Sequence, residues 1–438
     1  EKQVLKLIKG EELIGHRYET FFPHLSVQKD IDHKIIAWED VDANEGCGVV
    51  HIAPGCGAED YELGKKYGLP EICPVNESGV FYDEYDFLSG KSASEASELV
   101  FEKLKDQGKL FKVQEYTHSY PVCWRCKTEV IFRLVREWYI QTSEIKPKLI
   151  EEAEKVKWEP AFIGKRMNDW LQNMGDWNIS RKRFYGLPLP LYPCKKCGHL
   201  TVVGSKEELV ELGGEVARNL PELHRPWIDE VKIKCPHCGN EVERVPDVGD
   251  VWLDAGIVPF STLGYFSDRA KWEENFPVEW VTEMQEQVRL WFYSLLFMSV
   301  TLTGRAPYEK VQAYGKVVAE DGTKFSKTGF MIPFNEAADK IGADAVRYIF
   351  ASAPIAGDVR FGYTLGEEAR RKLLGFWNIC SFFTTYAEID KPQIKKCDPE
   401  NPVDRWLNSR VADFINKAKK SYESYNTCLL YTSPSPRD

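Results

Sequence analysis

Three pairs of cysteines have the Cys-x-x-Cys spacing of metal-binding knuckles: Cys123/Cys126, Cys194/Cys197 and Cys235/Cys238. In the second and third pairs a glycine, Gly198 or Gly239, follows the second cysteine. Glycine readily takes the positive φ that turns backbone N–H groups toward a thiolate. Two such knuckles provide four thiolates, the tetrahedral ligand set of a structural Zn²⁺ site. We therefore predict that Zn²⁺ binds Cys194, Cys197, Cys235 and Cys238; the alternative is four free, buried thiols.

The remaining pair, Cys123 and Cys126, has no obvious second pair in this chain to complete a metal site. Two interpretations stay open. The pair is either a redox-active Cys-x-x-Cys motif or half of a metal site whose other ligands lie upstream of residue 1. The residues between the thiols, Trp124 and Arg125, do not decide between these two.

A loop with two lysines is the second candidate for chemistry. The run Asp321 to Gly329 contains Lys324, Ser326 and Lys327, and Asp-Gly at its start is a turn signal. Two ammonium groups on such a loop can cover a triphosphate, and they stabilise the charge that develops on leaving pyrophosphate. By itself the Lys-x-Ser-Lys motif is weak, because most such runs are solvated loops.

The elements that position these residues follow from the apolar periodicity and from the Gly and Pro breaks. Between residues 34 and 81, short apolar runs separated by Gly and Pro predict strands of a barrel or sandwich. After residue 246, strands alternate with helices, which predicts a parallel α/β sheet with one strand over 311–319. Helices are expected at 60–67, 93–107, 146–156, 164–174, 287–302, 335–351, 366–388 and 402–425.

The composition is that of an ordinary soluble globular protein, with 438 residues of which 43% are hydrophobic and 28% charged. The formal net charge of −10 argues against a surface that is basic throughout, although it allows a local basic groove. The most apolar run, 288–302, is shorter than the roughly 20 residues of a membrane-spanning helix. Because the first residues do not have the pattern of a signal peptide, we expect a cytoplasmic protein without membrane contact.

The lysine loop resembles the lysine signature of class I aminoacyl-tRNA synthetases, usually Lys-Met-Ser-Lys-Ser, and reads Lys324-Phe-Ser-Lys-Thr328 here. Upstream, Glu283-Met-Gln-Glu-Gln-Val-Arg-Leu-Trp-Phe-Tyr293 resembles the Glu-Gly-x-Asp-Gln-x-Arg-Gly-Trp-Phe block of the isoleucyl enzymes. Residues 177–190 resemble their Ile-Ser-Arg-x-Arg-x-Trp-Gly-x-Pro segment, and residues 118–127 and 247–256 match two further blocks. Five blocks in the family's order, within residues 34–425, are more specific than any single one.

The resemblance implies roles for the matching residues. Glu283 and Gln287 would contact the aminoacyl-adenylate, and Trp291 would form a wall of the isoleucine pocket; taken alone, Trp291 would be interpreted as a core aromatic. Tyr185 stands where the family usually has Trp, so it is also assigned to the substrate site. In the lysine loop Lys324 and Lys327, with Ser326 between them, would bind the ATP triphosphate.

Three departures from the family pattern bear on these roles. Met284 replaces a Gly, Tyr185 replaces a Trp, and Phe325 replaces a Met. The first two changes lie where they can reshape the amino-acid pocket.

From the same resemblance we expect the second half of a Rossmann-type catalytic core. It would activate isoleucine with ATP and Mg²⁺ and transfer it to tRNA(Ile). The histidine signature, which belongs to the first half of that fold, is not in the chain. We therefore expect a truncated fragment, inactive alone, of an enzyme that is monomeric when full length. Residues 428–438 resemble translated sequencing adaptor and are interpreted as a non-native tail.

Residues 46–61 resemble the editing insertion of these enzymes, Gly-Thr-Gly-x-Val-His-x-Ala-Pro-x-x-Gly-x-x-Asp-Tyr. The resemblance implies that Asp60 anchors the α-ammonium group of a misacylated Val-tRNA(Ile) and that His51 helps to seat its 3′ end. Taken alone, His51 would be interpreted as a hydrogen-bonded core histidine. Editing is needed because one methylene provides only about 1–3 kcal/mol of discrimination, isoleucine against valine being the standard example.

The resemblance also implies a domain plan, and on this plan the partners of Cys123 and Cys126 lie upstream. The expected parts are the C-terminal part of a β-rich editing domain (1–115), a return into the catalytic core (116–190), a zinc-ribbon insertion (191–245), the second half of the Rossmann domain with the lysine loop and a helical stem-contact region (246–395), and the start of an α-helical anticodon-binding domain (396–427).

Three alternatives compete with the isoleucyl interpretation. The nearest is a valyl-tRNA synthetase, which the run Leu223-His-Arg-Pro-Trp-Ile-Asp-Glu-Val231 disfavours. A non-catalytic zinc-ribbon module that binds RNA would need a basic surface, which the net charge of −10 does not favour. A free-standing deacylase, with its site in the region around Asp60, would leave residues 116–427 without a function.

Overall fold

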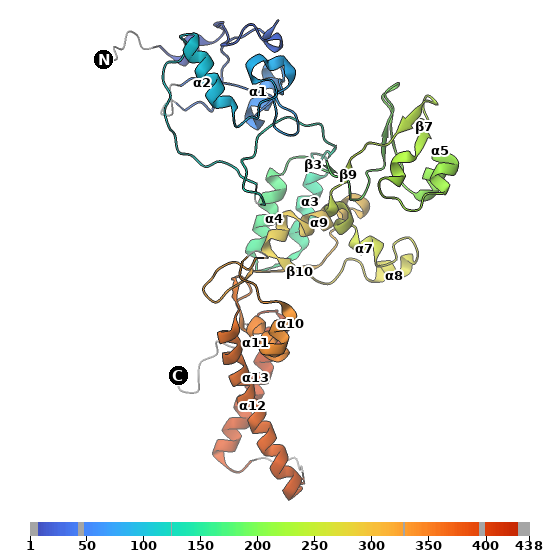
Figure 1. The fold of residues 1–438 in the computed structure, drawn as a ribbon. Coiled ribbons are helices and arrows are strands. Elements are labelled where there is room, and N and C mark those ends of the chain that lie inside the picture. The colour runs from blue at the N-terminus through green and yellow to red at the C-terminus, as the bar shows by residue number, and fades with distance from the viewer. Residues whose placement is uncertain (1–7, 43–47, 124, 327–328, 394–398, 428–438) are drawn as a thin grey trace. The chain divides into compact units, whose positions relative to one another are not determined.

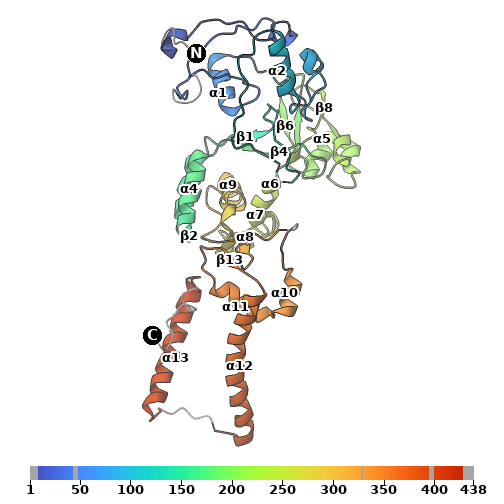
Figure 2. The same cartoon turned by 60° about the vertical axis from the view of Figure 1, so that its left-hand side comes forward.

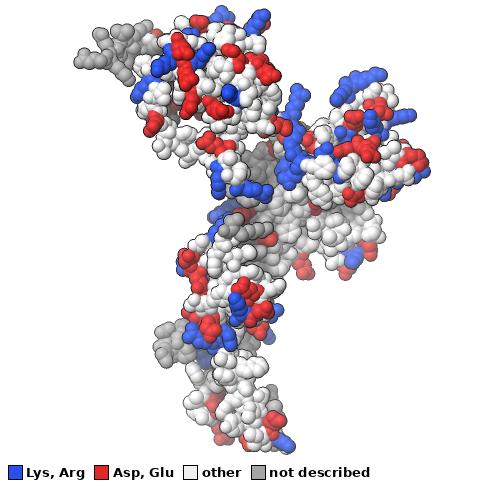
Figure 3. Space-filling model, viewed as in Figure 1, with Lys and Arg blue, Asp and Glu red and all other residues white. Residues whose placement is uncertain are grey.

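The computed structural model describes residues 8–42, 48–123, 125–326, 329–393 and 399–427. It divides into two compact units, Glu1–Arg136 and Glu137–Asp438 (Figure 1). Over the face seen in Figure 3, Lys and Arg side chains are interspersed with Asp and Glu, in line with the net charge of −10. The domain boundaries expected from the sequence stay predictions.

Helices form the regular structure of the described part of the first unit. These are α1 (Ala58–Tyr67), α2 (Ala96–Asp106) and 3-10 helices at Gly10–Leu13, Ser26–Gln28 and Asp83–Leu88. Helix α1 ends as predicted, because Gly68 takes the left-handed conformation with φ 66° and its N–H bonds the carbonyl of Gly64. Helix α2 confirms the predicted amphipathic helix, since its apolar face packs on a small core of Leu25, Tyr85 and Leu88.

The strands expected between residues 34 and 81 are not formed in the described part of this unit. Pairing is limited there to isolated bridges, such as Val75 with Phe81. A strand needs a neighbour for its backbone groups, and the apolar side chains of Val49 and Val50 stay 57% and 50% exposed. The glycines instead allow close packing of loops: a Cβ on Gly55 would lie 1.7 Å from the carbonyl oxygen of Ile72.

A three-stranded parallel sheet is the framework of the second unit, as predicted. Its order is β10 (Val281–Met284), β11 (Lys310–Tyr314) and β2 (Lys157–Glu159), so one strand comes from before residue 246. The helices α3 (Lys146–Lys155), α4 (Phe162–Asn173) and α9 (Trp291–Thr303) share one apolar core with it. Helix α9 begins later than predicted, because Gln285–Arg289 form a 3-10 helix and Leu290 is not helical.

The segment with the second and third cysteine pairs, predicted as a module at 191–245, has a hydrophobic core of its own. Two antiparallel hairpins, β5 (Leu191–Pro193) with β6 (Leu200–Val202) and β7 (Lys232–Lys234) with β8 (Glu241–Glu243), each carry one knuckle at the turn. Helix α5 (Lys206–Arg218) and a 3-10 helix at Trp227–Glu230 lie between the hairpins in the chain. Tyr192, Ile233 and Val242 are buried among its core residues.

Short elements connect this module to the sheet. Strand β4 (Ser180–Arg181) pairs with β9 (Val248–Gly249), and β1 (Tyr139–Ile140) pairs with β3 (Trp177–Asn178), both antiparallel. Helices α6 (Val251–Gly256), α7 (Val258–Ser261) and α8 (Arg269–Glu274) follow β9. Helix α6 lies directly on α9, since a Cβ on Gly256 would come within 2.8 Å of the Ser294 carbonyl oxygen.

Two predictions for the last part of the chain were wrong in detail. The single strand expected over 311–319 is two strands in different sheets, β11 and β12 (Val317–Val318), and β12 pairs in parallel with β13 (Val359–Arg360). The chain changes sheets at Gly315, which lies against Gly357. The helix expected over 335–351 is also two, α10 (Phe334–Lys340) and α11 (Ala343–Ser352), because Gly342 between them has φ 98°.

The two longest helices, α12 (Tyr363–Asp390) and α13 (Pro402–Glu423), confirm the last two predicted helices. Over most of their length no other described element covers them (Figure 2). Large apolar side chains on both helices are therefore exposed, among them Trp377, Phe383, Trp406 and Phe414. None of the described helices combines the length and the apolar character required to cross a membrane.

Candidate active site and metal centre

The candidate active site lies at the carboxyl edge of the parallel sheet, the edge where open α/β sheets bind ligands. We call this edge, with the segment from Glu283 to Trp291, the ligand edge. Strands β10 and β11 end side by side, with Met284 paired with Tyr314. Glu283 is the penultimate residue of β10, and the chain continues directly into the 3-10 helix with Gln287 and into α9 with Trp291. The three sequence-predicted residues therefore follow one another along this edge.

Two hydrogen bonds fix the carboxylate of Glu283. Its Oε2 accepts the backbone N–H of Met284 at 2.6 Å and the hydroxyl of Tyr314 at 3.3 Å. Partial burial and the nearby Glu283 charge raise the pKa of Tyr314, so this phenol stays a hydrogen-bond donor. Tyr314 was not singled out from the sequence, because only the pairing of β10 with β11 brings it to Glu283.

Hydrogen bonds connect Gln287 to Trp291 and Trp291 to helix α6. Gln287 Oε1 accepts the backbone N–H of Trp291 at 3.0 Å, and the indole N–H of Trp291 donates to the carbonyl of Ala255 at 2.9 Å. Trp291 is half-buried at the margin of the main core. Its ring orientation is thus fixed while part of its surface stays open, as a pocket wall requires.

Asp250 joins two of the sequence blocks beside this edge. Its Oδ2 accepts the indole N–H of Trp177 at 3.2 Å and a guanidinium N–H of Arg181 at 2.7 Å, while its Oδ1 caps helix α6. Asp247 pairs with Lys182 at 3.0 Å. These contacts bring residues 177–182 and 247–256 together.

The lysine loop follows β12 and is held at its base. Ala319 N–H bonds the carbonyl of Thr323 at 2.8 Å, and the half-buried Phe325 packs on Phe330 with ring centres 5.6 Å apart. Lys324 and Ser326 are exposed, as residues that contact a ligand must be. Lys327 lies outside the described residues.

An ion pair links the base of this loop to the ligand edge. Lys316, just before β12, lies 2.6 Å from the carboxylate of Glu286. The pKa of Glu286 is held below its usual range mainly by Lys316, and the positive charge of Lys324 contributes. Lys324 is therefore close enough to help lower the pKa of Glu286, which lies three residues after Glu283 in the chain.

Tyr185 does not join this group through any contact of the described residues. Its ring is 74% exposed and lies flat on His224 of the cysteine module, with centroids 5.5 Å apart and planes at 4°. This partner could not be predicted, because His224 is distant from Tyr185 along the chain.

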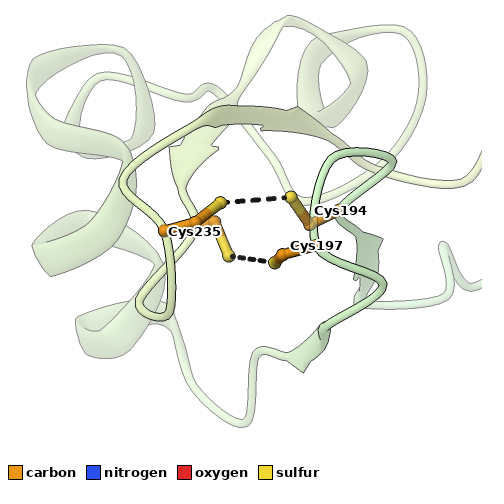
Figure 4. A group of neighbouring side chains, drawn as sticks. Cys194, Cys197 and Cys235 are labelled. Atoms are coloured by element: carbon orange, nitrogen blue, oxygen red, sulfur yellow. Dashed lines mark hydrogen bonds between the residues drawn. The ribbon is translucent and has the colours of Figure 1, made fainter.

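The four cysteines of the module converge as predicted (Figure 4). Their sulfurs all lie within 4.8 Å of one another, and Cys194–Cys238 and Cys197–Cys235 are 3.6 and 3.7 Å apart. Zinc–sulfur bonds of about 2.3 Å in a tetrahedron require sulfurs about 3.8 Å apart. The donor set therefore fits Zn²⁺ in both chemistry and spacing.

The pKa values of Cys194 and Cys197 are shifted in opposite directions. The backbone N–H of Cys197 donates to Cys194 and lowers the pKa of that thiol to about 7. The N–H of His199 likewise favours the thiolate of Cys197, yet desolvation and the neighbouring sulfurs raise its pKa to about 12. A divalent cation bound among the sulfurs would stabilise the thiolate form of all four.

The first cysteine pair forms the same backbone turn as the other two. In each knuckle the N–H of the first cysteine bonds the carbonyl five residues later at 2.8 Å, and the fourth residue after it has a positive φ. That residue is Gly198, Gly239 or, in the first pair, Lys127 with φ 63°. Hydrogen bonds from Thr128 lower the pKa of Cys126 to about 7. Among the described residues, no third metal ligand lies beside Cys123 and Cys126.

The two residues predicted for editing lie near one turn of the first unit. Asp60, in the first turn of α1, accepts the backbone N–H of Ala53 at 3.0 Å and is half-buried. His51 is exposed, which contradicts the alternative of a core histidine. The structure gives no contact that joins His51 to Asp60.

Comparison with known proteins places this geometry in a family. The family model described as tRNA synthetases class I (I, L, M and V) matches residues 71–362. The chain belongs to the class I tRNA synthetases. The match contains the sheet, the four-cysteine cluster and the lysine loop, so these parts belong to one family fold.

Two curated relatives of this class I synthetase chain are isoleucine–tRNA ligases. The protein from Methanothermobacter thermautotrophicus is 36% identical over 433 residues, which cover 97% of this chain and 41% of that protein. The protein from Clostridium acetobutylicum is 38% identical over 434 residues, which cover 97% of this chain and 42% of that protein. The chain thus spans about two fifths of the length of these relatives.

One solved structure resembles the class I synthetase fold of this chain. Mycobacterium tuberculosis methionyl-tRNA synthetase, in complex with methionyl-adenylate, aligns with a TM-score of 0.50 and 13% identity. The alignment covers 71% of this chain and 52% of that chain. At this identity the likeness concerns the fold alone.

Proposed function

We propose that the chain is part of an isoleucine–tRNA ligase, which activates isoleucine with ATP and transfers it to tRNA(Ile). The observation that carries the proposal is the ligand edge, where Glu283, Gln287 and Trp291 follow one another from β10 into α9. The curated relatives named isoleucine–tRNA ligase support the amino acid. No described feature favours the valyl alternative.

In this proposal each residue of the edge has one task. Glu283, held by Tyr314, and Gln287 bind the polar groups of the aminoacyl-adenylate, and Trp291 forms a wall for the side chain. Lys324 and Lys327, with Ser326, bind the triphosphate of ATP, whose Mg²⁺ accompanies it as in other nucleotide-dependent ligases. Their ammonium groups act most strongly when charge develops on leaving pyrophosphate.

Zn²⁺ has a structural task in the proposal. The four-sulfur set of Cys194, Cys197, Cys235 and Cys238 is closed, and such sites stabilise a fold and do not activate water. The knuckle turn at Cys123 and Cys126 supports the half-site interpretation over the redox one, because it has the same hydrogen bonds as the two zinc knuckles.

We further propose that residues 1–115 belong to an editing domain that hydrolyses misacylated Val-tRNA(Ile). Asp60 would bind the α-ammonium group, and its half-buried carboxylate in the first turn of α1 is consistent with that task. His51 would contact the 3′ end of the tRNA from its exposed position. The exposed apolar face of α13 supports our proposal that a helical anticodon-binding domain starts within residues 396–427.

The whole enzyme is proposed to be a cytoplasmic monomer. The test is pyrophosphate exchange by the full-length protein that contains this chain, with isoleucine, valine and leucine compared at equal concentrations. We expect the highest kcat/KM with isoleucine. Exchange that is faster with valine or leucine, or absent with all three, contradicts the proposal.

A further inference from the structure

Two exposed aromatic rings, Phe184 and Tyr185, are held by residues of the zinc module. Tyr185 and Phe184 are 74% and 60% exposed, yet each ring has a fixed partner. His224 lies parallel to Tyr185, and the guanidinium carbon of Arg225 lies 4.9 Å from the centre of the Phe184 ring. Ring stacking and cation–π contacts orient a ring without covering it. Tyr185 is therefore oriented on one face while much of its surface stays open to a ligand.

Arg225, which follows His224 in the chain, is fixed by an ion network that includes the buried Arg244. Arg225 Nε donates to Asp229 at 2.6 Å, and Asp229 also pairs with Arg244, whose side chain is only 1% exposed. Arg244 donates in addition to the carbonyls of Leu189 and Asp247, at 3.2 and 2.9 Å. Removing acceptors from a buried guanidinium is costly, so these groups keep one arrangement.

The same network closes one end of the hairpin that carries a zinc knuckle. Strands β7 and β8 are joined at one end by the turn with Cys235 and Cys238. At the other end, Asp229 lies just before β7 and Arg244 directly follows β8. The metal ligands and the ion network therefore hold opposite ends of one short hairpin.

We propose that His224 is a positioning residue for Tyr185, and that the zinc site maintains this contact through the β7–β8 hairpin. The inference rests on the proposed function in one respect, the assignment of Tyr185 to the amino-acid pocket. The zinc module then does more than stabilise the fold. It sets the orientation of one ring at the substrate site, and loss of the metal releases that ring.

The test uses the 438-residue chain with 3-fluorotyrosine incorporated at position 185 and its ¹⁹F resonance as the readout. His224→Ala removes the stacked ring, so the resonance is expected to move toward the position of free fluorotyrosine. His224→Phe restores a flat partner and is expected to restore the original position. Leu223→Ala is the matched control, because Leu223 is the exposed neighbour in sequence, and this variant should leave the resonance unchanged.

The metal arm of the experiment removes zinc with a chelator or through Cys238→Ser. Either change should move the Tyr185 resonance in the direction of the His224→Ala variant, while zinc content and circular dichroism of His224→Ala itself stay normal. An unchanged resonance in His224→Ala, an equal shift in Leu223→Ala, or no response to zinc removal overturns the proposal. Because this readout needs no catalysis, a failure of the proposed function would appear separately, in pyrophosphate exchange.

Discussion

At the scale of single residues, the cysteines give the sharpest prediction. We expect one tightly bound Zn²⁺ per chain, measured by plasma mass spectrometry after dialysis. Cys238→Ser should abolish this zinc, because three thiolates leave the tetrahedral site open. Cys123→Ser is the matched control and should leave the stoichiometry unchanged, since no third ligand lies beside that pair among the described residues. Two zinc ions per chain, or zinc lost in Cys123→Ser alone, contradict the assignment.

The lysine loop gives a second prediction at this scale. In the full-length protein, Lys327→Ala should slow adenylate formation on the order of 10²-fold, because the ammonium group acts on charge that develops in the transition state. The dissociation constant of isoleucine should change little. Single-turnover kinetics and equilibrium binding measure the two effects. An unchanged rate removes Lys327 from the catalytic group, and a large loss of isoleucine binding shows a different role.

A residue can be assigned from the sequence when its motif lies within one short run of the chain, and not when its role depends on a contact between distant segments. The knuckles were recognisable because ligand spacing and the following glycine lie within six residues. Glu283, Gln287 and Trp291 form one continuous run and were found together. Tyr314, His224 and Arg244 were missed, because each acquires its partner only when distant segments meet: the Tyr314–Glu283 contact needs the register of β10 and β11.

At the scale of elements, the path of the chain from β11 in one sheet to β12 in another can be tested by substituting Gly315. A Cβ on Gly315 would lie 2.1 Å from the carbonyl oxygen of Gly357, so the backbone must move in Gly315→Ala. We expect a loss of about 1–3 kcal/mol in the free energy of unfolding, as for other overpacked sites. Urea unfolding followed by circular dichroism measures it.

Gly375→Ala is the control for this substitution. Gly375 lies inside α12 and a Cβ there meets nothing within 4 Å. Alanine should therefore be neutral or stabilise the helix by up to about 1 kcal/mol. If Gly315→Ala is as stable as Gly375→Ala, the close approach of Gly315 to Gly357 is wrong.

Helices were predicted better than strands, for a physical reason. A helix satisfies its own backbone groups, so the periods in 146–156 and 164–174 were sufficient to find α3 and α4. A strand depends on a partner, and among the described residues the apolar runs of 34–81 form only isolated bridges. The sequence does not predict the breaks at Gly315 and Gly342. A glycine inside a periodic run reveals neither its φ, as at Gly342, nor its close approach to a distant segment, as at Gly315.

At the scale of the whole molecule, the division into two units predicts where proteases act first. The segment 109–136 contains no helix or regular strand in its described part and exposes Lys109, Lys112 and Arg136. Limited trypsin digestion should cut first within this segment, because cleavage needs accessible, locally unfolded chain. The larger product should retain all the zinc, since the four ligands lie in the second unit. A first cut within 137–427 contradicts this division.

The central claim is that the ligand edge of this chain activates isoleucine, and pyrophosphate exchange tests it most directly. The full-length protein should exchange pyrophosphate into ATP with isoleucine at a higher kcat/KM than with valine, by about 10²-fold if one methylene is the only difference. The 438-residue chain alone should show no exchange, because β10 is an edge strand of the described sheet and the site is open beside it. Preference for valine, or full exchange by the isolated chain, contradicts the account.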